Sequence, residues 1–539
     1  RSSRSASSIG NSTSIRSQVS PTRHVTDQVS APSGWRGPVP GITAIRTYER
    51  SWLRFDVVAG IVLAAVLVPQ GMAYAELAGL PPVTGLYTTI ACLVGYALMG
   101  PSRILVLGPD SAVSPLIFAP IVPLVVVSDD PETAIALAGM MAVMVGLILI
   151  GLGAGTLGFV ADLLSKPVQV GYMNGLAITI FVGQLPKLSG FSTDADGFVD
   201  EIDKFVEGFD GRNQTALWLG LATLAILLLL PRLTKRIQAV LVAVIGATAV
   251  TAIFDLDIST VGTLPEGLPR PSLPWTSVGD MAPMLIAAVG ITLVSLTDTI
   301  ATSTAFAARR GEEVNPDQEM IGIGSANIAA GLFQGFAVST SSSRTAVADQ
   351  TGSKSQLTGL IGAGMVALLL VFFNGLLKSL PQTALAAVVI AAAFSLVNVS
   401  TLRRYLQVRR TSFVLSLTAT AGVVFFGVLE GILIAVVLSI LLFFRRNWWP
   451  HGEVLGQLDD GTDWHSNHNS FATHQLPGIV VYRWEAPLFF ANAGMFREQV
   501  RDLVRKRKPR WVVLQCQAIT DIDVTAAGVL EQLDLELNA

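Results

Sequence analysis

The sequence predicts a mainly α polytopic membrane protein followed by a small α/β domain. Hydrophobic residues make up 51% of the 539 residues, charged residues make up only 14%, and the mean hydropathy is +0.57. Polarity varies along the chain and divides it into four parts. We predict a disordered polar tail over residues 1–45, a transmembrane domain over 46–446, a linker over 447–476 and a soluble domain over 477–539.

Fourteen apolar segments account for the predicted transmembrane domain. A bilayer core about 30 Å thick requires about 20 apolar residues in each crossing helix. The third segment opens with Gly-Pro-Asp-Ser, and the tenth is too short to cross alone. The segments are residues 56–76, 80–99, 110–127, 133–154, 157–187, 215–231, 238–254, 280–307, 317–333, 341–352, 357–374, 378–397, 411–427 and 430–445.

The distribution of charge supports fourteen crossings, because cytoplasmic loops carry an excess of Lys and Arg. If residue 50 is cytosolic, the arginines near positions 103, 232, 309, 403 and 445 all fall on the cytosolic side. The loops that fall outside, at 128–132 and 194–210, are acidic. We therefore expect a multi-pass protein of the cytoplasmic (plasma) membrane, with its N-terminus and its C-terminal domain in the cytosol.

The third and tenth segments occupy equivalent places when the chain is divided into two sets of seven. Each follows a short β-like stretch, Ile104–Leu107 or Gly335–Val338. Paired interrupted helices in matching halves indicate inverted repeats with a binding site near the membrane midplane. Two half-helices that meet end to end direct free N–H groups and about half a positive charge each at one point, which favours an anion.

The tenth segment adds hydroxyls and a cation to this point. Residues 339–345 read Ser-Thr-Ser-Ser-Ser-Arg-Thr, and a charge at membrane depth persists only where it is buried in protein or lines a wet cavity. A guanidinium and free amides suit an oxyanion. The run therefore predicts a protein that moves anions. The alternative is that Arg344 is a structural clamp that pairs with an acid.

Several segments of the chain resemble the sulfate permease family (SulP), whose members transport and exchange anions such as sulfate, bicarbonate and chloride. The resemblance extends over roughly residues 40–539 and is most specific at 68–75, 107–112, 306–319 and 341–347. It implies fourteen helices in two inverted repeats, in which a core (helices one to four and eight to eleven) moves against a gate (five to seven and twelve to fourteen). It also implies a cytosolic STAS domain and a homodimer.

The soluble part of the sequence agrees with a STAS domain. Residues 478–483 and 511–515 read as strands and 493–506 as a helix. In some soluble STAS proteins a Ser or Thr at the place of Thr525 is phosphorylated, which would make this residue regulatory. Asp523 or Thr525 as a helix cap is the alternative. Because the chain stops at Ala539, before the last strand and helix of such domains, we expect the domain to be incomplete.

The resemblance implies an anion site between the third and tenth segments. Gln70 and Tyr74 are four residues apart on the first segment and therefore share one face. They would hydrogen-bond the substrate, although a packed bond between helices is the alternative. The other substrate-binding residues are Ser342, Ser343 and Arg344, with the backbone N–H groups of Ser111, Ala112 and Val113 opposite them.

An acid inside the eighth segment has three interpretations. Asp298 is costly as an isolated charge in the membrane, and the resemblance places it where the family carries an acid tied to cation coupling. Burial favours its neutral form, so that it would take up a proton with the anion. Alternatively, Asp298 and Thr302 hold Na⁺, or Asp298 forms a plain salt bridge to Arg344 that the substrate displaces.

Three further acids have structural explanations. We expect Glu76 to be a solvated residue at the outer rim of the first segment. Glu319 reads as a helix-start carboxylate that the helix dipole favours, and Asp110 reads as the cap of the third segment.

Our leading hypothesis is a secondary active transporter of sulfate or a similar oxyanion, coupled to protons and using elevator-like alternating access. Na⁺-coupled bicarbonate transport is the nearest alternative, followed by a channel or an uncoupled exchanger. A membrane sensor that signals to a cytosolic protein through its STAS domain belongs to another class. The sequence indicates no enzyme, no cofactor beyond coupling H⁺ or Na⁺ and no metal site, and a net charge of −3 gives no sign of nucleic-acid binding.

Overall fold

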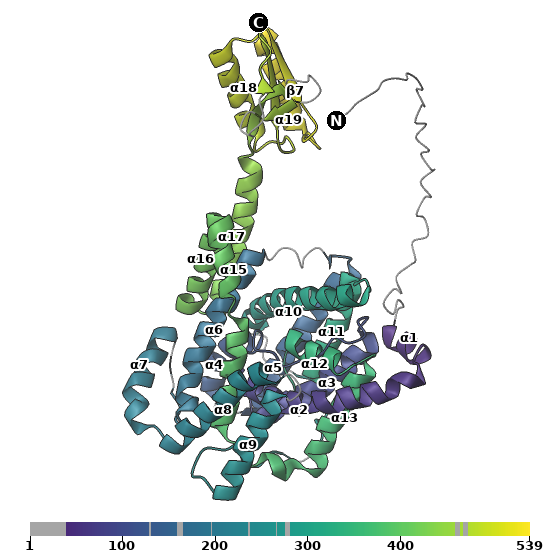
Figure 1. Cartoon of the computed structure of the whole chain (residues 1–539), viewed down its shortest axis with the longest axis vertical. Coiled ribbons are helices and arrows are strands. Elements are labelled where there is room, and N and C mark those ends of the chain that lie inside the picture. The colour runs from purple at the N-terminus through teal and green to yellow at the C-terminus, as the bar shows by residue number, and fades with distance from the viewer. Residues whose placement is uncertain are drawn as a thin grey trace, which may run out of the picture.

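The computed structural model describes residues 39–128, 131–158, 165–193, 195, 197–234, 238–265, 267–274, 281–458, 464–466 and 473–538. Helices dominate it, and a domain that contains a sheet stands clear of the helical body at the C-terminal end (Figure 1). All fourteen predicted segments correspond to helices, which confirms the predicted fold class. The first set of seven is α2 (Leu53–Leu77), α3 (Pro82–Met99), α4 (Ser114–Ser128), α5 (Pro131–Ala154), α6 (Lys166–Leu188), α8 (Gln214–Leu233) and α9 (Ala239–Phe254).

The second set of seven helices contains both the longest and the shortest of the fourteen described helices. α10 is the longest helix, with 30 residues, whereas α12 has only nine. Seven of the described helices are long and apolar enough to cross a membrane by length and composition alone, and four shorter helices are also apolar. The second set is α10 (Met281–Arg310), α11 (Pro316–Leu332), α12 (Ser342–Gln350), α13 (Leu357–Phe372), α14 (Gln382–Leu396), α16 (Arg410–Phe426) and α17 (Val428–Trp448).

Three further helices lie where the sequence predicted none. α1 (Pro40–Arg46) corrects the predicted tail at 1–45, of which residues 1–38 lie outside the described part of the chain. Its Gly41 is in close contact with α3, since a Cβ there would stand 2.6 Å from the carbonyl oxygen of Ala97. α7 (Phe198–Gly208) occupies the predicted acidic loop, and α15 (Val399–Val408) precedes α16. Both are amphipathic, and such short helices are easily read as polar loops.

A two-stranded antiparallel sheet joins the two interrupted places. β1 (Leu107–Gly108) pairs with β2 (Ser339–Thr340), in the register Leu107 to Thr340 and Gly108 to Ser339. The strands lie a few residues later than the β-like stretches predicted at 104–107 and 335–338. α4 and α12 begin within six residues of these strands, so the N-terminal ends of both half-helices are held at one crossing point.

The long helices pack in two groups. α5 and α3 pack along α11, and α2 packs along α13, which brings the first four and the middle four helices together. α6 packs against α14 and α16, and α8 packs against α14. Contact between the groups includes α2 with α14 and α9, and α17 with α4 and α10. These two groups match the core and the gate expected from the sequence, and the names are used for them below.

Glycines set the close approach of neighbouring helices in the core. A Cβ on Gly85 of α3 would stand 1.9 Å from the carbonyl oxygen of Gly71 on α2. Gly146 and Gly324 bring α5 and α11 together in the same way, with a Cβ on either at 2.6–2.7 Å from the carbonyl oxygen of the other. Small residues are typical of such interfaces between membrane helices, because they let the backbones approach.

The C-terminal domain contains a sheet with the strand order β4-β3-β6-β7, with β5 pairing to β3. Its strands are β3 (Gly452–Leu458), β4 (Trp464–Ser466), β5 (Thr473–His474), β6 (Ile479–Trp484) and β7 (Trp511–Gln515). Two helices, α18 (Ala493–Arg507) and α19 (Val524–Asn538), cover it, and Trp484 packs edge-on against Phe496 in its core. The predicted linker at 447–476 is therefore wrong where it contains β3, β4 and β5, and residues 452–455 of β3 pair with β6. Polar residues alternate with apolar ones in β3, and the sequence analysis therefore assigned this segment to the linker.

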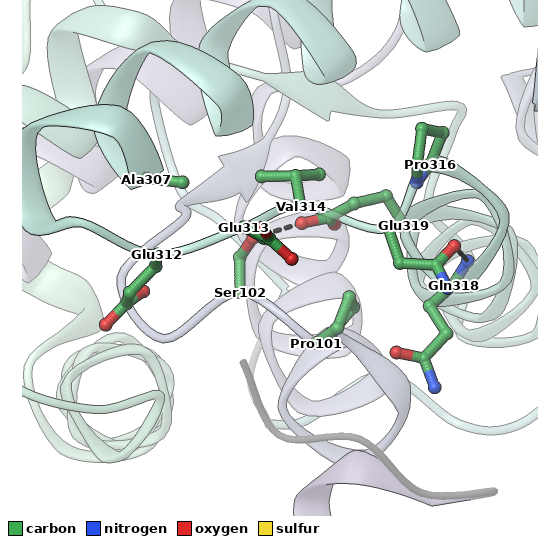
Figure 2. Close-up of a pocket in the computed structure, with 10 residues that line it drawn as sticks. Pro101, Ser102, Ala307, Glu312, Glu313, Val314, Pro316, Gln318 and Glu319 are labelled. Carbon is green, nitrogen blue, oxygen red and sulfur yellow. Dashed lines mark hydrogen bonds between the residues drawn. The ribbon is translucent and has the colours of Figure 1, made fainter. Parts of the chain in front are cut away.

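A buried carboxylate joins the start of α11 to α3. Glu319 is fully buried and accepts hydrogen bonds from Tyr96 Oη at 2.7 Å and from Ser102 Oγ. It lines a cavity of about 260 Å³ together with Ser102 and Glu312 (Figure 2). Glu319 lies in the first turn of α11, as the sequence predicted, while Asn315 caps the helix. Its hydrogen bonds to Tyr96 and Ser102 are an additional role that the sequence did not indicate.

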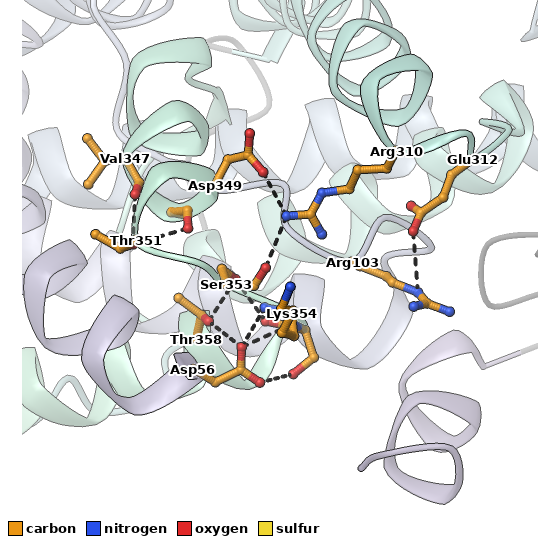
Figure 3. Close-up of polar contacts among 12 residues, drawn as sticks. Asp56, Arg103, Arg310, Glu312, Val347, Asp349, Thr351, Ser353, Lys354 and Thr358 are labelled. Atoms are coloured by element: carbon orange, nitrogen blue, oxygen red, sulfur yellow. Dashed lines mark hydrogen bonds and ion pairs between the residues drawn. The ribbon is translucent and has the colours of Figure 1, made fainter. Parts of the chain in front are cut away.

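A second buried carboxylate joins α2 to the segment between α12 and α13. Asp56 is fully buried and accepts five hydrogen bonds, some of which Figure 3 shows. The donors are Tyr48 Oη (3.2 Å), Lys354 N (2.7 Å), Ser355 N and Oγ (3.2 and 2.7 Å) and Thr358 Oγ1 (3.0 Å). Burial and the Asp56 charge raise the pKa of Tyr48 to about 12, so its hydroxyl remains a donor at neutral pH.

A third contact fixes the far end of half-helix α12. Arg310, the last residue of α10, forms an ion pair with Asp349 of α12 at 2.7 Å and donates to the carbonyl oxygen of Ser353 at 3.0 Å (Figure 3). Together with Asp56, this contact holds the C-terminal end of the half-helix within the core.

Asp56→Asn should lower the thermal stability of the chain. The amide keeps the shape of the carboxylate but loses its charge and half of its acceptor capacity, and hydrogen bonds to a charged group contribute about 1.5–3 kcal/mol each. We expect the apparent Tm of the detergent-solubilised protein to fall by several degrees. Glu49→Gln, which removes the same charge from an exposed acid nearby, is the control. Equal Tm values for the two variants would contradict the role of Asp56.

Candidate anion-binding site

Arg344 lies at the crossing of the two half-helices. It belongs to the first turn of α12 and is only 1% exposed. Its guanidinium lies against Gly108 of β1, where a Cβ would stand 3.3 Å from Nη1 and 3.5 Å from Nη2. Nη1 donates to the carbonyl oxygen of Pro109 at 2.5 Å. One edge of the guanidinium is therefore fastened to the strand that leads into α4.

The other edge of the Arg344 guanidinium is free to donate. Within the described ranges, Nε and Nη2 are buried and have no hydrogen-bond acceptor. The nearest carboxylate oxygen is Asp110 Oδ1, at 3.9 Å from Nη2, which is an ion pair but too long for a hydrogen bond. A buried charged donor without an acceptor costs more than a neutral one. The predicted clamp to an acid is therefore present only as the long ion pair between Nη2 and Asp110, whereas Nη1 is fastened to a backbone carbonyl oxygen.

Asp110 caps the turn at 111–113 that leads into α4, and it is also the acid nearest to Arg344. Its Oδ2 accepts from Ala112 N at 2.9 Å, and its carbonyl oxygen accepts from Val113 N at 3.3 Å and Ser114 N at 3.0 Å. The prediction that the N–H groups of Ala112 and Val113 face an anion is therefore wrong. A turn at 111–113 precedes α4, and an acid there turns the amide donors back on itself.

The N-terminus of α12 keeps its amide donors. Ser341 caps the helix, since its Oγ accepts from Arg344 N at 3.5 Å. No acceptor for the N–H groups of Ser342 and Ser343 is found among the described residues, and both side chains are exposed. Free amides at a helix N-terminus, with the dipole behind them, favour an anion. The donors that the sequence assigned to Ser342 and Ser343 are thus present.

Thr345 and Thr340 hold this end of α12 in place. Thr345 Oγ1 accepts from Val106 N at 3.1 Å, and Thr340 Oγ1 donates to Thr299 Oγ1 of α10 at 2.6 Å. Thr302, one turn further along α10, lies 3.3 Å from the hydroxyl of Ser342. α10 therefore supports the half-helix along the face that carries Asp298.

Asp298 lies on α10 and is half-buried. Its charge acts on both Asp110 and Arg344, so the three ionisable groups form one cluster. In the described part of the chain, however, Asp298 forms no ion pair, and Arg344 pairs with Asp110 instead. The predicted plain salt bridge between Asp298 and Arg344 is therefore wrong. Asp298 remains a carboxylate near the site without a fixed cation.

Of the two predicted residues of α2, Tyr74 lies closer to the anion site than Gln70. Tyr74 is 5% exposed, and its side chain lies close to Ser111 and in the field of Asp110 and Arg344. Gln70 is half-buried one turn away on the same helix. Pro69 stands inside α2 beside it, as the sequence shows. The structure therefore brings Tyr74, Ser111 and Arg344 together.

Two side chains near the site differ from expectation. Glu76, predicted as a solvated rim residue, is half-buried and in the field of Lys187 at the end of α6, so it faces the gate. Tyr172 of α6, which the sequence analysis did not consider, is fully buried and in the field of Asp298 and Asp110. A tyrosine in an apolar helix carries no signal in the sequence that separates a packed ring from a ligand.

Thr525, the candidate regulatory residue of the C-terminal domain, is exposed in the first turn of α19. The helix cap is Asp523, whose Oδ1 accepts from Ala526 N at 2.7 Å and whose Oδ2 accepts from Phe490 N at 2.8 Å. The capping interpretation of Asp523 is confirmed, and phosphorylation of Thr525 stays a prediction.

Inverted repeats, two half-helices joined at their N-terminal ends and a buried arginine between them define a multi-pass membrane protein of the anion-transporter class. The chain belongs to the sulfate permease family, whose model matches residues 53–419. The model of the STAS domain matches residues 470–539. The family predicted from the sequence is thereby confirmed.

Several relatives are named as sulfate transporters. The chain is 42% identical to a probable sulfate transporter of Mycobacterium tuberculosis over 94% of this chain and 90% of the relative. It is 30% identical to the chloroplastic sulfate transporter 4.1 of Arabidopsis thaliana, over 91% of this chain and 74% of that protein. It is also 30% identical to human solute carrier family 26 member 6, over 84% and 63%.

Solved structures share the fold at lower identity. The murine Slc26a9 anion transporter in its inward-facing state superposes with a TM-score of 0.85 and 22% identity, covering 93% of this chain and 86% of that one. The transmembrane domain of the cyanobacterial bicarbonate transporter BicA gives a TM-score of 0.64 at 22% identity, covering 73% and 98%. These similarities support the arrangement of two inverted sets of seven helices.

Gly108→Ala should weaken anion binding without unfolding the protein. The added methyl group would stand 3.3 Å from Arg344 Nη1, so the guanidinium must shift by a few tenths of an ångström. We expect a several-fold loss of affinity, measured from the dependence of the Tm of the purified chain on sulfate concentration. Gly364→Ala in α13, where nothing lies within 4 Å of the added Cβ, is the matched control. Unchanged affinity in Gly108→Ala would contradict the placement of the anion near this edge.

Proposed function

We propose that this chain is a secondary active transporter that carries sulfate, or a similar small oxyanion, across a membrane. The observation that carries this proposal is the donor set at the crossing of the half-helices: Arg344 Nε and Nη2 and the N–H groups of Ser342 and Ser343. Such a set suits a tetrahedral oxyanion, which can accept several charge-assisted hydrogen bonds at once. The relatives named as sulfate transporters support sulfate as the first substrate to test.

Coupling to protons follows from the position of Asp298. It lies in the same cluster as Arg344 and Asp110 but has no fixed cation among the described residues. An anion that enters the cluster adds negative charge beside this carboxylate, and uptake of one proton by Asp298 would offset that charge. Release of the anion on the other side would then favour release of the proton.

Na⁺-coupled bicarbonate transport is the second candidate. The hydroxyls of Thr302 and Ser342 lie 3.3 Å apart, one turn from Asp298, and a carboxylate with hydroxyl oxygens suits a hard cation. Both candidates use the same anion site. Whether transport is coupled to H⁺ or to Na⁺ therefore distinguishes between them.

The mechanism that suits this architecture is a displacement of the core against the gate. The core is held together by glycine contacts and by Asp56, whereas its contacts with the gate are fewer. We place the transporter in the plasma membrane as a homodimer, with the STAS domain in the cytosol. A sensor that signals through the STAS domain without transport is the alternative of another class.

Uptake of radiolabelled sulfate into proteoliposomes tests the proposal. Under an inward proton gradient we expect concentrative uptake by the wild type. Arg344→Ala should abolish it, because the anion loses its cation. Asp298→Asn should retain exchange of sulfate for sulfate but lose the response to the proton gradient.

Three outcomes would decide against parts of the proposal. A response to Na⁺ but not to protons, with bicarbonate as substrate, would favour the second candidate. Absence of flux with sulfate, bicarbonate and chloride in a protein that is folded would support the sensor. Proton-driven uptake that survives Asp298→Asn would remove Asp298 from coupling.

A further inference from the structure

The amphipathic helix α15 has an apolar face that the described part of the chain leaves uncovered. The helix packs against α16 and α6 of the gate. Val399, Leu402 and Leu406 share one face, because each lies within about 60° of the others around the helix. Val399 is nevertheless 60% exposed and Leu406 is 48% exposed. On a membrane protein, such an uncovered apolar face is expected to lie against lipid.

Arginines surround this face, and no acid accompanies them. α15 carries two, α16 begins with another, and a fourth lies between the two helices, and all four side chains are exposed. The chain contains no Asp or Glu between Asp349 and Glu430. Within the described ranges, none of the four arginines forms an ion pair. The four are Arg403, Arg404, Arg409 and Arg410.

α17 brings a further cation to the same end of the gate. α16 and α17 form a hairpin, in which a Cβ on Gly422 would stand 3.3 Å from the Cα of Gly431. Arg410 and Arg445 are equally far, to within one residue, from the turn at Gly427, so they lie at the same end of the hairpin. Arg445 is exposed, and α17 leads from this end directly into the C-terminal domain (Figure 1).

α6 contributes a sixth cation, because it runs parallel to α16. A Cβ on Gly171 would stand 2.3 Å from the carbonyl oxygen of Ser416, and a Cβ on Gly175 would stand 2.7 Å from Val423. The two helices therefore begin at the same end. Lys166, the first residue of α6, is exposed there and forms no ion pair in the part of the chain that the structure describes.

The six side chains and α15 together form a surface that fits an anionic lipid. The tendency of basic residues to collect on one side of a membrane accounts for the side on which they lie. It does not account for a separate helix that turns an uncovered apolar face outward among them. A basic amphipathic helix lies in the plane of the membrane interface and is attracted to anionic headgroups. A zwitterionic headgroup offers no net charge to the six cations.

We propose that this end of the gate is a binding surface for anionic phospholipids of the adjacent leaflet. The apolar face of α15 enters the acyl boundary, and the cations contact the headgroup phosphates. In the proposed transport cycle the contact would hold the gate in the bilayer while the core moves, although binding of the lipid does not itself depend on transport. The cations of this surface, called the basic surface below, are Lys166, Arg403, Arg404, Arg409, Arg410 and Arg445.

Titration of the purified full-length chain with short-chain phosphatidylglycerol tests this inference. Phosphatidylcholine of the same chain length is titrated in parallel, and the affinity is measured from the shift in Tm and from the number of lipids that native mass spectrometry finds bound. We expect the wild type to prefer phosphatidylglycerol. Arg403→Gln with Arg404→Gln should lower that affinity at least about tenfold, since each basic residue near an anionic membrane contributes roughly fivefold. The Tm without lipid should stay the same, because both side chains are exposed.

Arg505→Gln with Lys506→Gln is the matched control, because it removes the same charge from exposed residues of α18 in the C-terminal domain. Equal binding of the two lipids by the wild type would overturn the inference and would leave the basic surface to an acidic soluble partner. An equal loss of phosphatidylglycerol affinity in both double variants would also overturn it, since net charge alone would then explain the binding.

Leu406→Ser tests the apolar part of the surface without changing a charge. We expect it to weaken the binding of both lipids. Unchanged phosphatidylglycerol affinity in this variant, together with an equal shift in Tm from glycerol 3-phosphate, would assign the cations to a soluble anion and overturn the lipid assignment. None of these measurements requires flux, so a failure here leaves the transport proposal standing.

Discussion

The pairing of β1 with β2 is the constraint on which the site depends. Two residues from each half of the chain, more than 230 positions apart in sequence, form one antiparallel contact. Everything that defines the site is attached to it: α4 follows β1 after a short turn, and α12 follows β2 almost directly. Backbone that is not helical survives inside a membrane only where its polar groups are paired or line a cavity, and the two strands pair each other.

Arg344 illustrates how this crossing combines stability with binding. Its side chain extends from α12, in the second repeat, to Pro109, in the first. The hydrogen bond from Nη1 to the Pro109 carbonyl oxygen therefore joins the two repeats. The same guanidinium keeps two donors unpaired. A planar group with five donors can serve both purposes at once, whereas a lysine could not. Leaving Nε and Nη2 buried without acceptors costs free energy, and a bound anion would offset that cost by accepting hydrogen bonds from both.

The sequence predicted the helices and the crossing because both depend on local patterns. Apolar length identified the fourteen segments, and Gly108-Pro109 and the serine run located the two interruptions. The predictions from the sequence were wrong where they concerned which partner a polar group contacts in the folded chain. Asp110 rather than Asp298 lies nearest to Arg344, and the N–H groups of Ala112 and Val113 are used by Asp110.

The same limit explains the other misses. Glu319 lies at a helix start as predicted, but no local feature indicated that its oxygens accept hydrogen bonds from Tyr96 and Ser102, more than 200 residues away. Tyr172 offered no pattern at all, since a tyrosine in an apolar helix is usually packing. The strand at 452–458 was hidden because its hydrogen bonds go to β6, whose position no local feature records.

The location of the bound anion tests the central claim most directly. Crystals of the full chain grown with selenate, which has the charge and shape of sulfate, would show the selenium by its anomalous scattering. We predict a single strong peak within hydrogen-bonding reach of Arg344 and the first turn of α12. A peak elsewhere in the helical body, with Arg344 fully bonded to Asp110, would contradict it.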